Sequence, residues 1–101
     1  MTYIIFPRIE RDFDWNQAKS DRNRLKRGLP FDLAVMLFDR PTLERPDTRF
    51  DYQEERIQAI GMIGTVVLAC VYTDRGPVRR IISLRPAKRK ERDEYRAAFQ
   101  N

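Results

Sequence analysis

Two arginines and two helix residues near the end of the chain have the types and spacing for phosphate chemistry. Arg80 and Arg85 bracket the apolar, strand-like run Ile-Ile-Ser-Leu. A guanidinium binds phosphate through two parallel hydrogen bonds, so these arginines are candidates for holding a phosphodiester. Glu91 and Tyr95 stand four residues apart and would share one face of a helix, where they offer a carboxylate base and a phenolic donor. A solvated strand end, a charged helix face and a core tyrosine are the structural alternatives.

A second set of basic residues is suited to binding a phosphate backbone without taking part in chemistry. Lys26 and Arg27 close a predicted helix, where cations also complement the helix dipole. The run Lys88-Arg89-Lys90 is equally typical of a solvated helix face. The binding candidates are Lys26, Arg27, Lys88, Arg89 and Arg92.

The net charge of the chain lies in its last quarter. Residues 79–96 contain eight basic and three acidic residues, a net charge of +5 that equals the charge of the whole chain. Positive charge gathered on one strand and one helix attracts a nucleic-acid backbone. We therefore expect these cations to focus on one groove.

Composition excludes several classes of site. The 101 residues include one cysteine and no histidine, so a zinc site and a Cys–His nucleophile are excluded. No glycine-rich phosphate-binding motif is present, and we expect neither a cofactor nor a metal. Cys70 lies within the apolar run 65–72 and is predicted to be a core residue. No membrane span or signal peptide is predicted. A lone buried cysteine excludes an internal disulfide and suits a reducing cytoplasm. The chain length predicts a single domain over residues 1–101.

The predicted fold class is α+β, with two N-terminal helices, an antiparallel meander of three to four strands and a C-terminal helix. The helices are expected at 15–27, 31–38 and 88–99, all on one face of the sheet. Asp14 and Gln17 resemble a capping box before the first helix, and Gly28 ends it. A short edge strand and a loop are expected within 42–53, and further strands at 55–62, 64–72 and 78–84. Strict alternation in the last strand would put Ile81 and Leu84 on opposite faces.

An ordered set of residues resembles the BrnT-type toxins. It begins with Phe13-Asp-Trp15, Lys19, Asn23, Lys26-Arg-Gly28, Phe31, Ala34 and Phe38-Asp39, and continues with Asp51, Glu54-x-Arg56, Gly61, Val71-Tyr-Thr73, Arg80-Ile-Ile-Ser-x-Arg85-x-Ala87, Glu91-Arg92 and Tyr95. The resemblance implies a RelE-like fold and a metal-independent, RNA-cleaving toxin. It also implies a small BrnA-like antitoxin that supplies the DNA-binding part of an autoregulating toxin–antitoxin complex, so that the toxin reaches operator DNA only through the antitoxin.

One position departs from that family pattern. The family usually has Lys-His-Gly where this chain has Lys26-Arg27-Gly28. Cleavage of RNA without metal needs a base for the 2′-hydroxyl proton, cations around the phosphate and an acid for the leaving 5′-oxygen. A guanidinium stays protonated, so Arg27 cannot be the base, although it can bind phosphate. A non-catalytic RNA- or partner-binding module and an adaptor for an acidic protein are the alternative functions.

Overall fold

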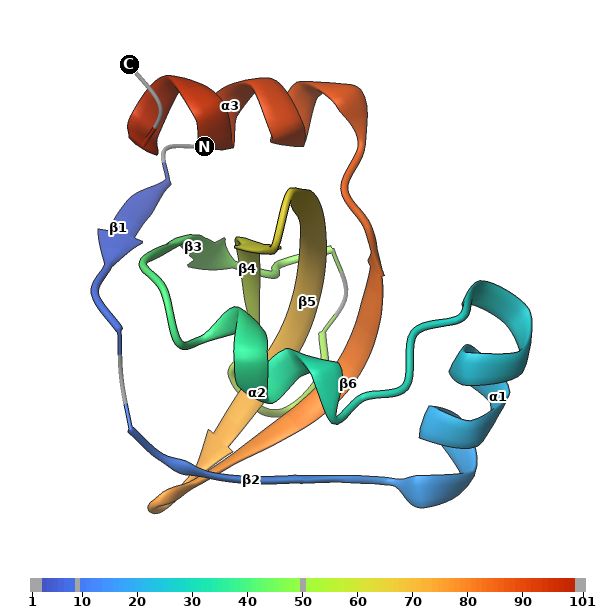
Figure 1. Ribbon diagram of the computed structural model, residues 1–101. Helices are drawn as coiled ribbons and strands as arrows, with labels where there is room; N and C mark the ends of the chain where they lie inside the picture. The colour runs from blue at the N-terminus through green and yellow to red at the C-terminus, as the bar shows by residue number, and fades with distance from the viewer. Residues whose placement is uncertain (1–2, 9, 50, 100–101) are drawn as a thin grey trace.

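The computed structural model describes residues 3–8, 10–49 and 51–99, which form a six-stranded sheet and three helices (Figure 1). In chain order the elements are β1 (Ile4–Phe6), β2 (Asp12–Trp15), α1 (Gln17–Arg27), α2 (Leu33–Leu37), β3 (Thr42–Pro46), β4 (Ile57–Ile63), β5 (Val66–Arg75), β6 (Val78–Pro86) and α3 (Arg89–Phe99). The predicted α+β class is confirmed, and the sheet is larger than expected.

The centre of the sheet is an antiparallel meander, as predicted. Strands β3, β4, β5 and β6 pair in sequence order, and β5 is buried continuously from Val67 to Thr73 because its residues are apolar on both faces. Two short strands that were not predicted flank the meander: β1 pairs antiparallel with β3, and β2 pairs parallel with β6. Strand β3, expected at an edge, is therefore internal.

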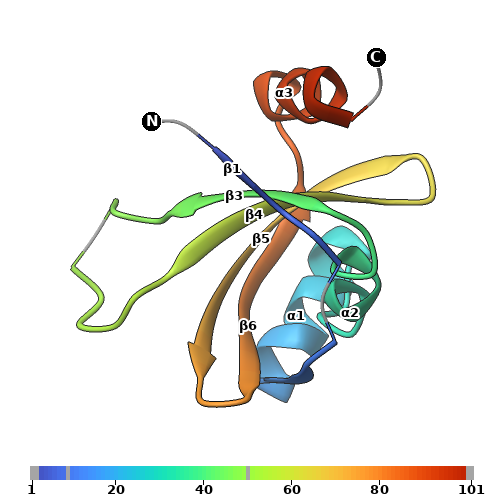
Figure 2. The same cartoon turned by 90° about the vertical axis from the view of Figure 1, so that its left-hand side faces the viewer.

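The helices cover both faces of the sheet, so the expectation of a single covered face is wrong (Figure 2). On one face, Phe31, Ala34 and Leu37 from the α2 region pack with Cys70 and other inward residues of β4 to β6. On the other, Tyr95 of α3 packs on alternate residues such as Ile60. Because β4 and β5 are apolar on both sides, both faces need a cover. Cys70 is fully buried in the core, as predicted.

A β-bulge in β6 changes which residues share a face. Val71 of β5 pairs with Ser83, but the next residue, Tyr72, pairs with Ile81, which leaves Ile82 as the extra residue. Ile81 and Leu84 consequently lie in the same core cluster. The prediction of strict alternation is wrong, because a bulge depends on pairing with the neighbouring strand. Arg80 and Arg85, which neighbour Ile81 and Leu84 in the strand, therefore lie on the sheet face opposite to this core cluster.

Helix α1 starts later than predicted and lies beside β6. Its N-cap is Asn16, whose side chain accepts a hydrogen bond of 3.1 Å from the Lys19 amide, while Asp14 belongs to β2. Gly28 ends the helix with a φ of 71°, as predicted. Within the described residues, strand β2 pairs with residues 78–81 alone, and α1 lies beside the next part of β6 (Figure 1). There the Asn23 side chain donates to the Leu84 carbonyl at 2.9 Å.

None of the described helices has the length and apolar character needed to cross a membrane.

The close contact between α2 and β4 depends on Gly61. A Cβ atom at this position would lie 2.8 Å from Cγ and Cδ1 of Leu37, which is fully buried. We predict that Gly61→Val lowers the free energy of unfolding by about 1–3 kcal/mol through overpacking, measured by urea denaturation. The control is Gly64→Asn in the following turn, where φ is +60° and the added Cβ meets nothing within 4 Å. An unchanged urea midpoint for Gly61→Val would contradict this packing.

Candidate active site

A buried carboxylate joins the end of β6 to the start of α3. Glu91 is only 6% exposed, and its two oxygens accept hydrogen bonds from Nη1 and Nη2 of Arg85 at 2.8 and 2.9 Å. The Lys88 amide donates to the same carboxylate at 2.7 Å, and the Gln58 side chain donates at 3.4 Å. Glu91 is the third residue of α3, where an acidic side chain reaches back to the amide that precedes the helix. The carboxylate therefore fixes the orientation of the Arg85 guanidinium.

The environment of Glu91 favours its charged form. Burial alone would raise its pKa, but the hydrogen bonds from Arg85 and from the Lys88 amide outweigh burial and lower the pKa below its ordinary value. Glu91 is consequently ionised at neutral pH and poorly suited to accepting a proton there.

The Arg85–Glu91 pair borders a small, cation-rich cavity. The cavity has a volume of about 190 Å³ and is lined by Tyr3, Arg45, Arg49, Gln58, Arg85, Lys88, Lys90, Glu91 and Glu94. Arg45 lies with its guanidinium 4.7 Å from the centre of the Tyr3 ring and donates through Nε to Gln58 at 2.9 Å. A chain of contacts thus runs from Arg45 through Gln58 and Glu91 to Arg85. The described lining has five cationic side chains and two carboxylates, and Asp47 outside the lining pairs with Arg49 at 2.9 Å. These groups together keep a net positive charge suited to a phosphate.

The structure brings together only part of the predicted catalytic set. Arg85 and Glu91 meet at the cavity, and Lys88 from the predicted binding set joins them. Tyr95 lies beneath α3, 4% exposed, with its hydroxyl 3.5 Å from the Pro41 carbonyl, and burial raises its pKa. Its spacing to Glu91 is helical as predicted, but the side chain packs in the core.

Arg80 is separated from the cavity along the same strand. Its Nη1 donates to Asp14 of β2 at 3.1 Å. Five residues of strand separate it from Arg85, which corresponds to about 15 Å at the usual rise. Arg80 therefore does not share the 190 Å³ cavity with Arg85.

The remaining predicted binding residues lie on two helices. On α3, Arg89 is exposed, and Arg92 donates to the Ala87 carbonyl at 2.7 Å. Lys26 and Arg27 line a different groove, between α1 and β6. The expected single groove is thus divided into two cationic surfaces, and Arg79, Arg80 and Arg85 of β6 each have a carboxylate partner.

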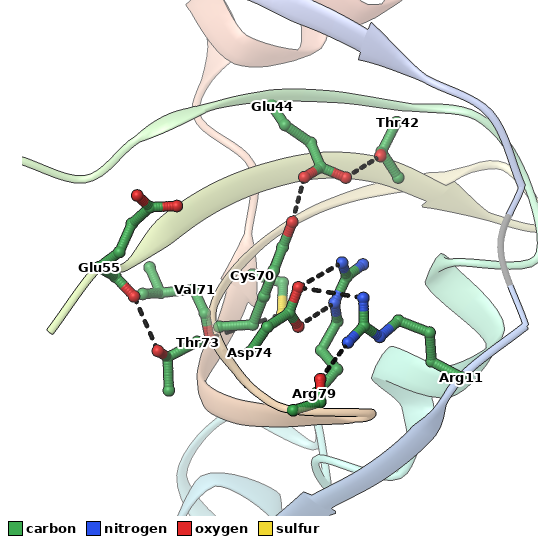
Figure 3. A network of polar contacts seen from close by, with 11 residues as sticks. Arg11, Thr42, Glu44, Glu55, Cys70, Val71, Thr73, Asp74 and Arg79 are labelled. Carbon is green, nitrogen blue, oxygen red and sulfur yellow. Dashed lines mark hydrogen bonds and ion pairs between the residues drawn. The ribbon is translucent and has the colours of Figure 1, made fainter.

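Arg79 is a structural residue in a buried polar network (Figure 3). It donates to Asp74 at 2.8 and 3.1 Å, and its guanidinium lies 3.8 Å from the centre of the Tyr72 ring. Arg11 reaches the same Asp74 carboxylate at 3.3 Å and so ties the segment before β2 to the β5–β6 turn. The other half of the network joins Tyr72 and Thr42, which both donate to Glu44. A cavity of about 470 Å³ lies beside these groups, but their charges are matched to one another.

Sequence reasoning missed Tyr3, Arg45 and Arg49 in the candidate site. They come from the N-terminal segment and from β3 and its following loop, and nothing in their local sequence distinguishes them from solvated residues. Only the pairing of β3 with β4 brings Arg45 opposite Gln58. Within the described residues, no group of three or more His, Cys, Asp or Glu side chains is placed to hold a metal ion.

The lowered pKa of Glu91 predicts a specific loss of stability in acid. A group whose folded pKa is depressed stabilises the fold above its unfolded pKa, and this contribution is lost as the pH falls through the folded pKa. We expect the unfolding free energy of the wild type to fall as the pH drops below 4.5, the ordinary value for this group. Glu91→Gln should be less stable at pH 7 and should show a shallower acid dependence in urea titrations. Asp93→Asn, an exposed neighbour, is the matched control; equal slopes for all three proteins would contradict the role of Glu91.

A family model matches most of the chain. The model for the BrnT ribonuclease toxin of type II toxin–antitoxin systems matches residues 15–91, which include α1 to β6 and both partners of the Arg85–Glu91 pair. No curated protein matches the chain. Because the match covers most of the sequence and contains the cation-bearing strand and the start of α3, the chain belongs to the family of BrnT ribonuclease toxins of type II toxin–antitoxin systems.

Proposed function

We propose that this toxin cleaves RNA without a metal ion and binds the scissile phosphate in the cavity between β6 and α3. The observation that carries the proposal is the Arg85 guanidinium, held through two hydrogen bonds by Glu91 at the wall of a cavity lined by further cations. The Arg85 side chain is still 24% exposed. A preorganised cation of this kind stabilises the charge that develops on a phosphate during reaction.

The proposed reaction is an internal transesterification. The 2′-oxygen attacks phosphorus, the bond from phosphorus to the 5′-oxygen breaks, and the products carry a 2′,3′-cyclic phosphate and a 5′-hydroxyl. We assign Arg85 and Lys88 to the non-bridging phosphate oxygens. Water accepts the proton of the 2′-hydroxyl, and the Lys88 ammonium supplies the proton that the leaving 5′-oxygen requires, after which solvent reprotonates the amine.

Glu91 has a positioning role in this scheme. Its oxygens are engaged by Arg85, the Lys88 amide and Gln58, and its pKa is lowered, which disfavours proton transfer at neutral pH. Burial and the Arg80–Asp14 ion pair likewise favour structural roles for Tyr95 and Arg80. Electrostatic stabilisation then supplies most of the rate enhancement, because removing one such donor typically costs about 10²–10³-fold.

The exposed cations Arg89 and Lys90 and the partly buried Arg92 extend the positive surface of α3 from the cavity. We assign them to the RNA backbone that flanks the cut site, since phosphate contacts set affinity without reading sequence.

The family implies a cognate protein antitoxin. We propose that this antitoxin is BrnA-like, that it carries the DNA-binding part through which the pair reaches its operator, and that the toxin acts on RNA in the cytoplasm.

A non-catalytic RNA- or partner-binding module of the same fold is the second candidate. The observation that favours it is Arg27, which stands where the family resemblance has histidine and cannot accept a proton. A pure binder would be tolerated when expressed alone and would leave RNA intact, whereas a nuclease would arrest growth and degrade RNA.

The proposal predicts that the Arg85–Glu91 pair is needed for cleavage more than for folding. Arg85→Met combined with Glu91→Met removes both charges and avoids an unpaired buried carboxylate, and such replacements often preserve or raise stability. We expect the double variant to keep its circular dichroism spectrum and to cleave single-stranded RNA roughly 10²–10³-fold more slowly in EDTA.

The matched control is Arg96→Gln, an exposed cation in the last turn of α3 that does not line the cavity. It should cleave like the wild type. Intact RNA after incubation with folded wild-type protein would reject the nuclease function, and undiminished cleavage by the double variant would reject this cavity as the active site.

A further inference from the structure

A second cationic groove lies between α1 and β6, apart from the cavity at α3. It has a volume of about 320 Å³, and its lining includes Lys19, Arg22, Lys26, Arg27, Ile82 and Ser83. Among the residues that the structure describes, no carboxylate belongs to this lining. Within the described part of the chain, none of the four cations has a carboxylate within 4.0 Å, whereas the arginines of β6 are all paired.

The charge pattern of α1 exceeds what the helix itself requires. Cations near a helix C-terminus complement the dipole, which accounts for Lys26 and Arg27 in the last turn. Lys19 and Arg22 lie earlier in the helix, and the first turn contains no acidic residue. Residues three or four apart repel when their charges are alike, so this cationic face weakens the isolated helix. An anion bound in the groove would relieve that repulsion.

The groove is held rigidly against the strand that carries Arg85. The Asn23 amide of α1 donates to the Leu29 carbonyl at 2.7 Å and to the Leu84 carbonyl at 2.9 Å. Buried Ser20 accepts from the Phe31 amide at 2.9 Å on the same side of the helix. Leu84 precedes Arg85, so α1 and the cavity flank the same end of β6. The bulge residue Ile82 and Ser83 form the floor between the helix and the strand.

We infer that the α1 groove is a second binding site for the RNA backbone and holds phosphates that flank the cut site on the far side of β6. This inference rests on the proposed nuclease function. Within the groove, Arg27 takes the role of a phosphate ligand, to which a permanently charged, planar guanidinium is suited. We assign RNA to the groove in preference to an acidic protein segment. Protein interfaces are usually centred on accessible aromatic side chains. Phe31, the one aromatic residue in the described lining, is only 3% exposed.

The salt dependence of binding tests this inference directly. The probe is a fully 2′-O-methylated 20-nucleotide RNA, which cannot be cleaved, and the variant is Lys19→Gln with Arg22→Gln, two exposed residues of the groove outside the last turn of α1. The slope of log K against log salt for single strands is about −0.7 per phosphate contact, so the variant should lower its magnitude by about 1.4. The control with equal charge is Arg24→Gln with Arg96→Gln, exposed residues outside both cationic sites, and its slope should match the wild type.

Two further measurements separate this inference from the nuclease function and from a role in folding. The groove variant should cleave a dinucleotide like the wild type but a long RNA more slowly, and its melting temperature should stay the same or rise as repulsion is removed. A wild type that cleaves nothing would reject the nuclease function, while the salt slope would still report on the groove. Equal slopes for groove and control variants would overturn the inference. So would an unchanged RNA slope combined with lost binding of poly-L-glutamate, which would assign the groove to an acidic protein segment.

Discussion

The buried carboxylate of Glu91 is the constraint on which the candidate site depends. An ionised carboxylate removed from water loses several kcal/mol of hydration, which charge partners and hydrogen bonds must offset. Arg85, the Lys88 amide and Gln58 supply that compensation from β6, the start of α3 and β4. One side chain therefore fixes where α3 begins, how it sits on the sheet and which way the Arg85 guanidinium points.

The Arg85–Glu91 ion pair has two opposing effects on the candidate site: it weakens the positive field of Arg85 and it fixes the orientation of the guanidinium. A carboxylate partner weakens the field of Arg85, so the positive potential of the cavity depends on the additional cations from α3 and β3. The two hydrogen bonds to Glu91 also orient the Arg85 guanidinium before any substrate binds. Preorganised charge costs no rearrangement during reaction, which is the advantage of a fixed over a mobile cation. The proposed mechanism therefore relies on positioning and electrostatics more than on proton transfer.

Features set by local sequence were predictable, and features set by pairing between distant segments were not. The apolar run of β5, the glycine that ends α1 and the acidic residue at the start of α3 carry their signals within a few residues. The parallel pairing of β2 with β6 has no such signal, and it turned a predicted helix cap, Asp14, into a partner of Arg80. The burial of Arg79 likewise depends on Tyr72 and Phe38, aromatic neighbours from other segments. Such pairings also decide the candidate site, because Arg45 reaches it only through the register of β3 on β4.

The bulge in β6 links the fold to both cationic surfaces. By inserting Ile82, it keeps Ile81 and Leu84 in one core while turning Arg85 toward α3. It also interrupts the strand where β2 ends and α1 begins to cover the edge, so that Ser83 lies in the floor of the α1 groove. A regular strand would place Arg85 on the face covered by α2, away from Glu91. One inserted residue thus places the oriented Arg85 guanidinium on one side of β6 and leaves the strand beside the cationic face of α1 on the other. Both proposed RNA contacts therefore depend on the same irregularity of one strand.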